Sequence, residues 1–446
     1  MNYLERELWL TPLLGPMPAA MRLVRHAGFA DYMLYERDDR WTYAGGSVLM
    51  IAVDHRGLHA RGIGMDAHAP GDSVASSGGP ADVVAAARLL EESSVPDWRA
   101  YGWLAFEAGG TTPSETPQLC LTVPQVEVRL DEAGHALLRA TDAATLDRLA
   151  SVLLEESTDT TASGQVALDL QAGGAAYQEL VSRAVSQVQD TELRKVIVSR
   201  RIEVDKEIDL AATYEAGRSA NSPARSYLFA MGGLRAAGFS PETVVEIDRR
   251  VITTHVLAGT RATGSDQDAT DALRDQLLGD AKEVHEHAIT VADALTDFAQ
   301  VCAPDSAAAT RFMKVVRRGS VQHLASTLRG ELAEHVDPWA ALCALFPPAA
   351  ATGVPRRAAL DTIRRLEERE RGLYGGAVIA CDAHGGLDAA LALRTVFQRN
   401  GRTWLQAGAG VTSGSDPRRE FEETCEKLRS VAPFLVPTHD AGSKAD

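Results

Sequence analysis

A run rich in β-branched side chains reads Arg194-Lys195-Val196-Ile197-Val198-Ser199-Arg200-Arg201-Ile202-Glu203-Val204, a composition typical of a strand. A stretch with helical spacing precedes it over 177–192, and longer helical patterns cover 268–301 and 417–431, the last with Asp416 as its cap. Further strands are predicted over 376–397 and 403–407. Because strands and helices follow one another without a regular βαβ rhythm, the pattern favours a mixed α/β (α+β) layered fold over a doubly wound sheet.

The first part of the chain predicts short strands around the polar turn 37–40, an amphipathic helix over 81–93 and a buried strand over 101–107. It contains no nucleotide-binding glycine fingerprint, so we interpret it as a scaffold. Residues 155–164 are polar and lack apolar periodicity, which predicts a surface connection. We therefore expect three parts: a supporting subregion over 1–165, a catalytic region over 166–436 and a flexible tail over 437–446.

Composition excludes several classes of function. The 446 residues carry a formal net charge of −16, so phosphate backbones and anionic lipid surfaces are repelled and neither nucleic acid nor membrane is an expected partner. The odd number of cysteines, 5, without a C-x-x-C pair, favours reduced thiols. No signal-peptide profile and no apolar run long enough to span a membrane occur, and we therefore expect a cytoplasmic protein.

Two pairs of glutamates could hold a metal ion. Glu283 and Glu286 lie three residues apart in a helical stretch, as do Glu420 and Glu423 in the last helix, so each pair shares one helix face. Two such helices side by side would gather an oxygen-only site suited to Mg²⁺. From spacing alone, solvated helix faces remain the more common explanation, and Lys427 could equally form a surface ion pair with Glu423.

An acid and a base can also be nominated. Lys195 alternates with Leu193 and Ile197 along its strand, and a desolvated lysine can act as a general base, although a lysine at a sheet edge is the commoner case. Glu242 follows Pro241, whose ring fixes the local turn, so a buried Glu242 would be protonated and could act as a general acid. The alternative is that Glu242 is an acid at a strand edge, exposed to water.

Other signals are weaker. A lone His323 between apolar neighbours is more often a hydrogen-bonded core residue than a catalyst, and no histidine spacing supports a zinc site. Glycine-containing loops at 257–261 and 407–410 would let backbone N–H groups approach an anion, but neither matches a nucleotide-binding motif.

Taken in order, these segments resemble the chorismate-binding family, which includes anthranilate, isochorismate and salicylate synthases. The matching segments are 195–200, 238–242, 257–261, 282–288, 319–327, 371–376, 404–410 and 419–428. The resemblance covers essentially all of 170–436, and more loosely 32–41 and 101–107. It implies one large fold with two stacked antiparallel sheets, helices outside, and a cleft between them.

The resemblance also implies roles. Glu286 and Glu423 would hold Mg²⁺, with Glu283 and Glu420 acting mainly through water. Lys195 would be the base, Glu242 the acid, and His323 would assist orientation. The substrate chorismate would be held by the remaining set, which comprises Gly259, Thr260, Tyr374, Arg394, Gly408, Ala409, Gly410 and Lys427.

The resemblance narrows the reaction. Members that use ammonia generally have Gln where this chain has Lys195, so water is the expected nucleophile, isochorismate the first product, and no glutaminase subunit is expected. Ala258 stands where aminodeoxychorismate synthases carry a nucleophilic lysine. The motifs look closest to salicylate synthases of siderophore pathways, which release pyruvate and salicylate. Release of isochorismate and a catalytically inactive relative remain as alternatives. A monomer is expected.

Two departures bear on the products. The family often has Thr where Ala350 stands, so a substrate-side hydroxyl would be missing unless Thr352 or water replaces it. Residues 254–256 stand where relatives often have a proline-containing run. The motif that binds tryptophan in feedback-regulated members is only approximated by 34–36, and no tryptophan control is expected.

Overall fold

The computed structural model describes a set of ranges that together cover most of the chain: 2–10, 15–62, 79–110, 116–155, 164–319 and 321–438. The predicted surface connection over 155–164 and the predicted tail over 437–446 lie almost entirely outside these residues. The remaining predicted elements can all be located.

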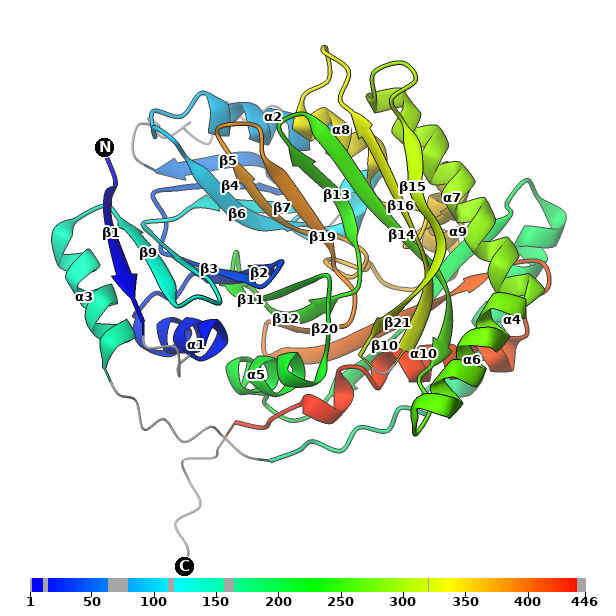
Figure 1. The fold of residues 1–446 in the computed structure, drawn as a ribbon. Coiled ribbons are helices and arrows are strands. Elements are labelled where there is room, and N and C mark those ends of the chain that lie inside the picture. Colours follow the sequence, from blue (N-terminus) through cyan, green and yellow to red (C-terminus); the bar gives the residue numbers. More distant parts are fainter. Residues whose placement is uncertain are drawn as a thin grey trace, which may run out of the picture.

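Two large antiparallel sheets form the body of the molecule (Figure 1). The first sheet has the strand order β1 (Leu4–Trp9), β9 (His135–Ala140), β8 (Val126–Leu130), β3 (Arg40–Gly45), β2 (Tyr32–Arg37), β11 (Arg225–Met231), β12 (Leu234–Ser240), β20 (Thr395–Arg399), β21 (Arg402–Val411), β10 (Lys195–Val204) and β17 (Gly353–Val354). The second has the order β15 (Ala308–Arg318), β16 (Val321–Glu331), β14 (Val251–Ala262), β13 (Thr243–Asp248), β19 (Leu387–Leu391), β18 (Ala377–Asp382), β6 (Arg99–Leu104), β7 (Leu119–Val123), β4 (Leu49–Asp54) and β5 (Gly57–Gly62). This confirms the predicted layered fold.

Both sheets run through the two predicted subregions. Strand β2 pairs with β11, and β6 pairs with β18. Each sheet therefore contains strands from both the N-terminal and the C-terminal subregion. Between the sheets lies an aromatic core to which both contribute, including Tyr227 and Phe397 from the first sheet and Trp103 from the second. The N-terminal part therefore supports the rest of the molecule by extending its sheets.

Helices cover the outer faces of the sheets (Figure 1). They are α1 (Pro16–His26), α2 (Pro80–Glu91), α3 (Ala143–Leu154), α4 (Gly174–Asp190), α5 (Leu210–Ala220), α6 (Gln267–Gly279), α7 (Ala281–Val301), α8 (Pro338–Leu345), α9 (Arg356–Leu366) and α10 (Pro417–Leu428). Helices α4, α9 and α10 pack on β10 and β21 of the first sheet, whereas α7 packs on β14 of the second. Within the described ranges, no helix is long and apolar enough to cross a membrane.

Two predicted elements need correction. The helix predicted over 268–301 is two helices, because the Asp280 carboxylate accepts hydrogen bonds from the backbone N–H groups of Lys282 (2.9 Å) and Glu283 (3.3 Å) and so begins α7 afresh. The strand predicted over 101–107 ends at Leu104, and a 3₁₀ turn, η1 (Phe106–Gly109), follows it. The first correction matters for the site, since it places Lys282 and Glu283 in the first turn of α7.

Candidate active site

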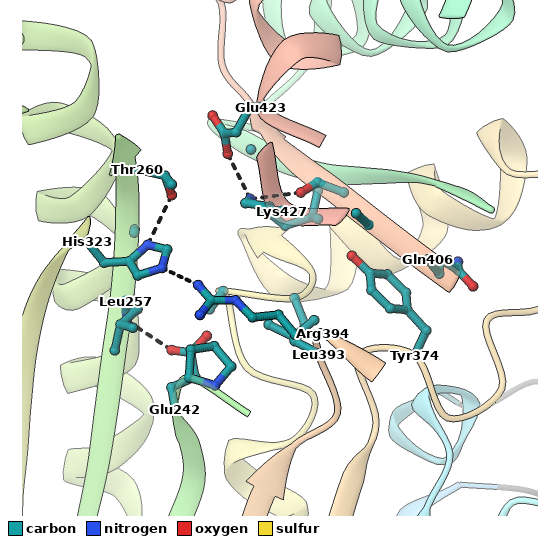
Figure 2. A pocket seen from close by; sticks show the side chains of 18 of the residues that line it. Glu242, Leu257, Thr260, His323, Tyr374, Leu393, Arg394, Gln406, Glu423 and Lys427 are labelled. Atoms are coloured by element: carbon teal, nitrogen blue, oxygen red, sulfur yellow. Dashed lines mark hydrogen bonds and ion pairs between the residues drawn. The ribbon is translucent and has the colours of Figure 1, made fainter. Parts of the chain in front are cut away.

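One cavity collects most of the predicted site residues (Figure 2). Its lining includes twelve of them: Lys195, Glu242, Gly259, Thr260, Glu286, His323, Tyr374, Arg394, Gly408, Gly410, Glu423 and Lys427. They come from both sheets, from α7 and α10, and from the connections that carry Glu242, Tyr374 and Arg394. Three predicted residues, Ala409, Glu283 and Glu420, do not line it.

Lys195 is buried at the start of β10, with 1% of its side chain exposed. Its ammonium donates to Thr290 Oγ1 at 2.9 Å and lies 3.1 Å from Glu286 Oε1. Ile197, two residues further along the same strand, lines the same cavity. Sequence analysis missed Thr290, whose position one turn after Glu286 in α7 was the available signal.

Glu242 is buried between β12 and β13, where Pro241 directs the chain from the first sheet to the second. Its Oε2 accepts a hydrogen bond of 2.9 Å from the backbone N–H of Leu257. Burial raises the pKa of Glu242 to about 7, although the Leu257 N–H and the Lys195 ammonium both lower it. A substantial fraction of the carboxyl is therefore protonated at neutral pH and able to donate a proton.

His323 holds Arg394 in place beside Glu242 (Figure 2). Arg394 Nη2 donates to His323 Nε2, and a guanidinium has no acceptor, so the imidazole is neutral with its proton on Nδ1. That nitrogen faces Thr260 Oγ1 at 3.1 Å. Burial, and then the Arg394 charge, hold the pKa of His323 well below its ordinary value. His323 therefore orients the Arg394 guanidinium.

Four glutamates cluster where α7 meets α10. Glu286 lies between the ammonium groups of Lys195 (3.1 Å) and Lys282 (3.1 Å), and Glu423 pairs with Lys427 at 2.7 Å. Burial alone would raise the pKa of Glu286, but the two lysines outweigh it and hold the pKa at about 2. The pKa of Glu423 is likewise lowered, since Lys427 and Lys282 overcome the effect of burial. Both carboxylates are ionised.

The other two glutamates stand behind this pair. Glu283 Oε2 accepts from the Thr260 N–H at 3.0 Å, and its Oε1 lies 3.3 Å from Arg261. Glu420 lies 3.2 Å from Lys282, and its Oε2 is buried without a hydrogen-bond partner. Burial, and then the Glu423 charge, raise the pKa of Glu420 to about 7. The four carboxylates are thus balanced by the ammonium groups of Lys195, Lys282 and Lys427 and by the Arg261 guanidinium.

These features fit a hard divalent cation. The donors are all carboxylate oxygens, the kind of ligand that Mg²⁺ prefers. The buried Oε2 of Glu420 has no hydrogen-bond partner. The neighbouring Glu423 charge disfavours ionisation of Glu420, and a bound cation would remove this repulsion. As the side chains are placed, no three acidic, histidine or cysteine side chains of the described residues surround a common metal position. The Lys282 ammonium lies among the carboxylates instead.

Two glycines of β21 keep the cavity open. A Cβ at Gly410 would lie 2.2 Å from Glu286 Oε1 and 3.0 Å from Lys195 Cε, and one at Gly408 would lie 3.0 Å from the Tyr374 hydroxyl. The Gly408 carbonyl accepts from Lys427 Nζ at 2.8 Å. A side chain at Gly410 would displace Glu286 and Lys195, and one at Gly408 would press on the Tyr374 hydroxyl.

Ala409 does not have the predicted role. Its N–H donates to the Tyr177 hydroxyl at 3.2 Å, on the side of β21 that α4 covers, so it is not directed at the cavity. Strand alternation likewise turns the Ala409 side chain away from the face on which Gly408 and Gly410 lie.

The wall at Ala350 is apolar. Ala350 lines the cavity, whereas Thr352 is fully buried outside it and donates its hydroxyl to the Pro348 carbonyl at 3.0 Å. Thr352 therefore does not replace the hydroxyl that is missing at Ala350.

A two-sheet fold with a buried acid, a buried lysine and a carboxylate cluster around one cavity defines a chorismate-binding enzyme. The model of the chorismate binding enzyme family matches residues 36–433, and the chain belongs to this family. It is 39% identical over 428 residues to the salicylate synthase of Mycolicibacterium paratuberculosis, a match that covers 94% of this chain and 92% of that protein. It is 36% identical to the anthranilate synthase component 1 of Mycolicibacterium smegmatis over 57% of this chain and 50% of that one. The solved structure of the menaquinone-specific isochorismate synthase from Escherichia coli superposes with a TM-score of 0.73 at 21% identity, covering 97% of this chain and 95% of that one.

Proposed function

We propose that this protein is a Mg²⁺-dependent salicylate synthase that converts chorismate to isochorismate and then to salicylate and pyruvate. The observation that carries the proposal is that one cavity contains both a possible acid and a possible base. The acid is Glu242, whose pKa of about 7 keeps a proton available, and the base is the buried Lys195. The similarity to a salicylate synthase over nearly the whole of both chains supports the same choice.

In the first step Lys195 would act once its ammonium has lost a proton: the neutral amine takes a proton from water as the water oxygen attacks ring C2. The double bonds shift, the C4–O bond breaks, and Glu242 supplies the proton with which the C4 hydroxyl leaves as water. Isochorismate is therefore an isomer of chorismate, and the step needs no oxidant. Glu242 and Lys195 line the same cavity from different parts of the chain, so one bound substrate could meet both groups.

The substrate carries two carboxylates, and the cavity offers cations for both. Arg394, fixed by His323, would bind the enolpyruvyl carboxylate together with the Tyr374 hydroxyl. Burial lowers the pKa of Arg394 only to about 10, so the guanidinium stays charged at neutral pH. Lys427 would support the ring carboxylate from the other end of the cavity, where Figure 2 shows it beside Glu423.

Glu286 and Glu423 line the cavity and would hold Mg²⁺ directly, with Glu283 and Glu420 behind them. When bound, the ion would supply positive charge that binds and polarises the ring carboxylate. The protein's part is to keep Glu286 and Glu423 ionised and to position them, which the adjacent lysines and Gly410 do.

In the second step hydrogen moves from C2 to the enolpyruvyl side chain as pyruvate leaves and the ring becomes aromatic. The transfer is intramolecular, so confinement and orientation are what it requires of the protein. Release of isochorismate is the second candidate function, and one observation favours it: the cavity wall is a methyl group at Ala350.

Purified protein incubated with chorismate and Mg²⁺, with products separated by chromatography, tests the proposal. We expect salicylate and pyruvate in equal amounts, and none of either after Mg²⁺ is removed with a chelator. Isochorismate without pyruvate would establish the second candidate. No turnover would favour a catalytically inactive relative, and anthranilate formed from added ammonia would contradict the role of Lys195 in activating water.

The proposal extends to the setting of the enzyme. A water-using enzyme needs no glutaminase subunit, and we propose that the chain works as a monomer in the cytoplasm, supplying salicylate for siderophore assembly. Its mass in solution, alone and with chorismate, tests the first part.

A further inference from the structure

The side chain of Lys282 enters the carboxylate cluster from the first turn of α7. Its ammonium lies 3.1 Å from Glu286 Oε2, 3.2 Å from Glu420 Oε1 and 3.5 Å from Glu283 Oε1. Three carboxylates on two helices thus converge on one nitrogen. The side chain as a whole is 24% exposed, so the cluster lies close to solvent at Lys282.

This contact is built by the chain. Asp280 ends α6 and caps α7, which fixes Lys282 in the first turn, and the spacing of four residues places Lys282 and Glu286 on one helix face. Glu420 comes from α10, so Lys282 also joins two helices that would otherwise bring like charges together.

We propose that Lys282 is a tethered competitor for the metal: its ammonium takes the cation's place in the metal-free protein and must withdraw when Mg²⁺ binds. The inference rests on the proposed function in that it takes Mg²⁺ as the ion. Two consequences follow. Lys282 stabilises the metal-free protein by neutralising the cluster, and it weakens Mg²⁺ binding because part of the binding free energy is spent on displacing it.

The test is calorimetric titration of Mg²⁺ into wild-type protein and Lys282→Met without chorismate, together with thermal unfolding in a chelator. We expect Lys282→Met to bind Mg²⁺ at least about tenfold more tightly, since a unit charge near the ion is removed. Its metal-free form should unfold at a lower temperature than the metal-free wild type, and Mg²⁺ should raise its unfolding temperature by more.

Three variants make the result specific. Lys282→Gln, polar and uncharged, should tighten binding as Lys282→Met does, and it serves if the methionine variant does not fold. Lys282→Arg keeps a cation in the cluster and should not tighten binding. Lys206→Met, at an exposed lysine outside the site, should match the wild type.

The outcomes separate two failures. Equal affinity of wild type, Lys282→Met and Lys282→Gln for Mg²⁺, or weaker binding by the neutral variants, would overturn the competitor role. Absence of Mg²⁺ binding in every protein would instead overturn the metal site on which the proposed function depends.

Discussion

The two ends of the cavity hold the same chemical group in opposite states. At one end Glu242 is buried beside Leu257, and its pKa is raised to about 7. At the other end Glu286 is as deeply buried, yet two lysine ammonium groups hold its pKa at about 2. Burial is thus common to both, and the number of cations in contact decides which glutamate keeps its proton. The comparison teaches that one cavity can contain a proton donor and an anionic metal site if lysines are placed at one end only.

Removing the proton at the acid end is the largest change that the comparison predicts. Glu242→Gln preserves shape but cannot donate a proton, and the first step should slow by about 10³-fold or more. Chorismate should still bind, which calorimetry on the variant can establish. Turnover at the wild-type rate would end the assignment of Glu242 as the acid.

Glu107 provides the matched control. It is buried outside the cavity, its Oε1 accepts from the Arg371 N–H at 2.7 Å, and burial raises its pKa to about 7 as well. Because Glu107 lies outside the cavity, Glu107→Gln should leave the rate of the first step within roughly a few-fold of the wild-type rate. If Glu107→Gln lost as much activity as Glu242→Gln, the position of Glu242 in the cavity would not explain the loss, and its assignment as the acid would fail.

Crowding the anionic end should have the next largest effect. Gly410→Ala would place a methyl group 2.2 Å from Glu286 Oε1, so both Glu286 and Lys195 must move. Because displacements of this size cost on the order of 10²-fold in rate, kcat/KM should fall by about that factor. Gly414→Ala, where the added Cβ meets nothing within 4 Å, is the control and should turn over normally.

The pH dependence sharpens the comparison further. Glu242 donates only when protonated, and its raised pKa of about 7 means that the active form is present below that pH and lost above it. On the alkaline side, the protonated fraction of Glu242 should therefore fall by about tenfold per pH unit. Carboxyl-carbon NMR of labelled wild type and Glu242→Gln between about pH 5 and 9 checks this, and the absence of a signal that titrates near 7 and is lost in the variant would contradict it.

The smallest predicted effect concerns the products. Ala350→Thr adds a hydroxyl to an apolar part of the wall and leaves both ends of the cavity unchanged. We expect the ratio of salicylate to isochorismate to change by a few-fold, roughly the effect of one hydrogen bond. Chromatography of the products measures it; an unchanged ratio would remove Ala350 from the account of the second step.

Much of this site could be predicted from the sequence because helix and strand periodicity fix which side chains share a face. The spacing of Glu283 and Glu286 and the alternation around Lys195 each placed side chains correctly. The periodicity did not reveal that the Ala409 N–H donates to the Tyr177 hydroxyl, a contact with a distant helix. Position within a motif is a weaker guide than the direction in which a strand presents its residues.

Other features depend on contacts between distant segments, which no local pattern contains. The hydrogen bond from Leu257 to Glu242 and the contact between Lys282 and Glu420 join residues from different elements. The break at Asp280 was within reach, since an aspartate after glycine is a common helix start, but the continuous apolar periodicity masked it.

The most direct test of the central claim, that Lys195 and Glu242 together add water at C2 and expel the C4 hydroxyl, is the reaction run in ¹⁸O-labelled water with Mg²⁺. The account predicts salicylate with one ¹⁸O atom, in its phenolic hydroxyl, and unlabelled carboxylates, as read by mass spectrometry. Salicylate without the label would contradict the account, because its hydroxyl would then have come from chorismate itself.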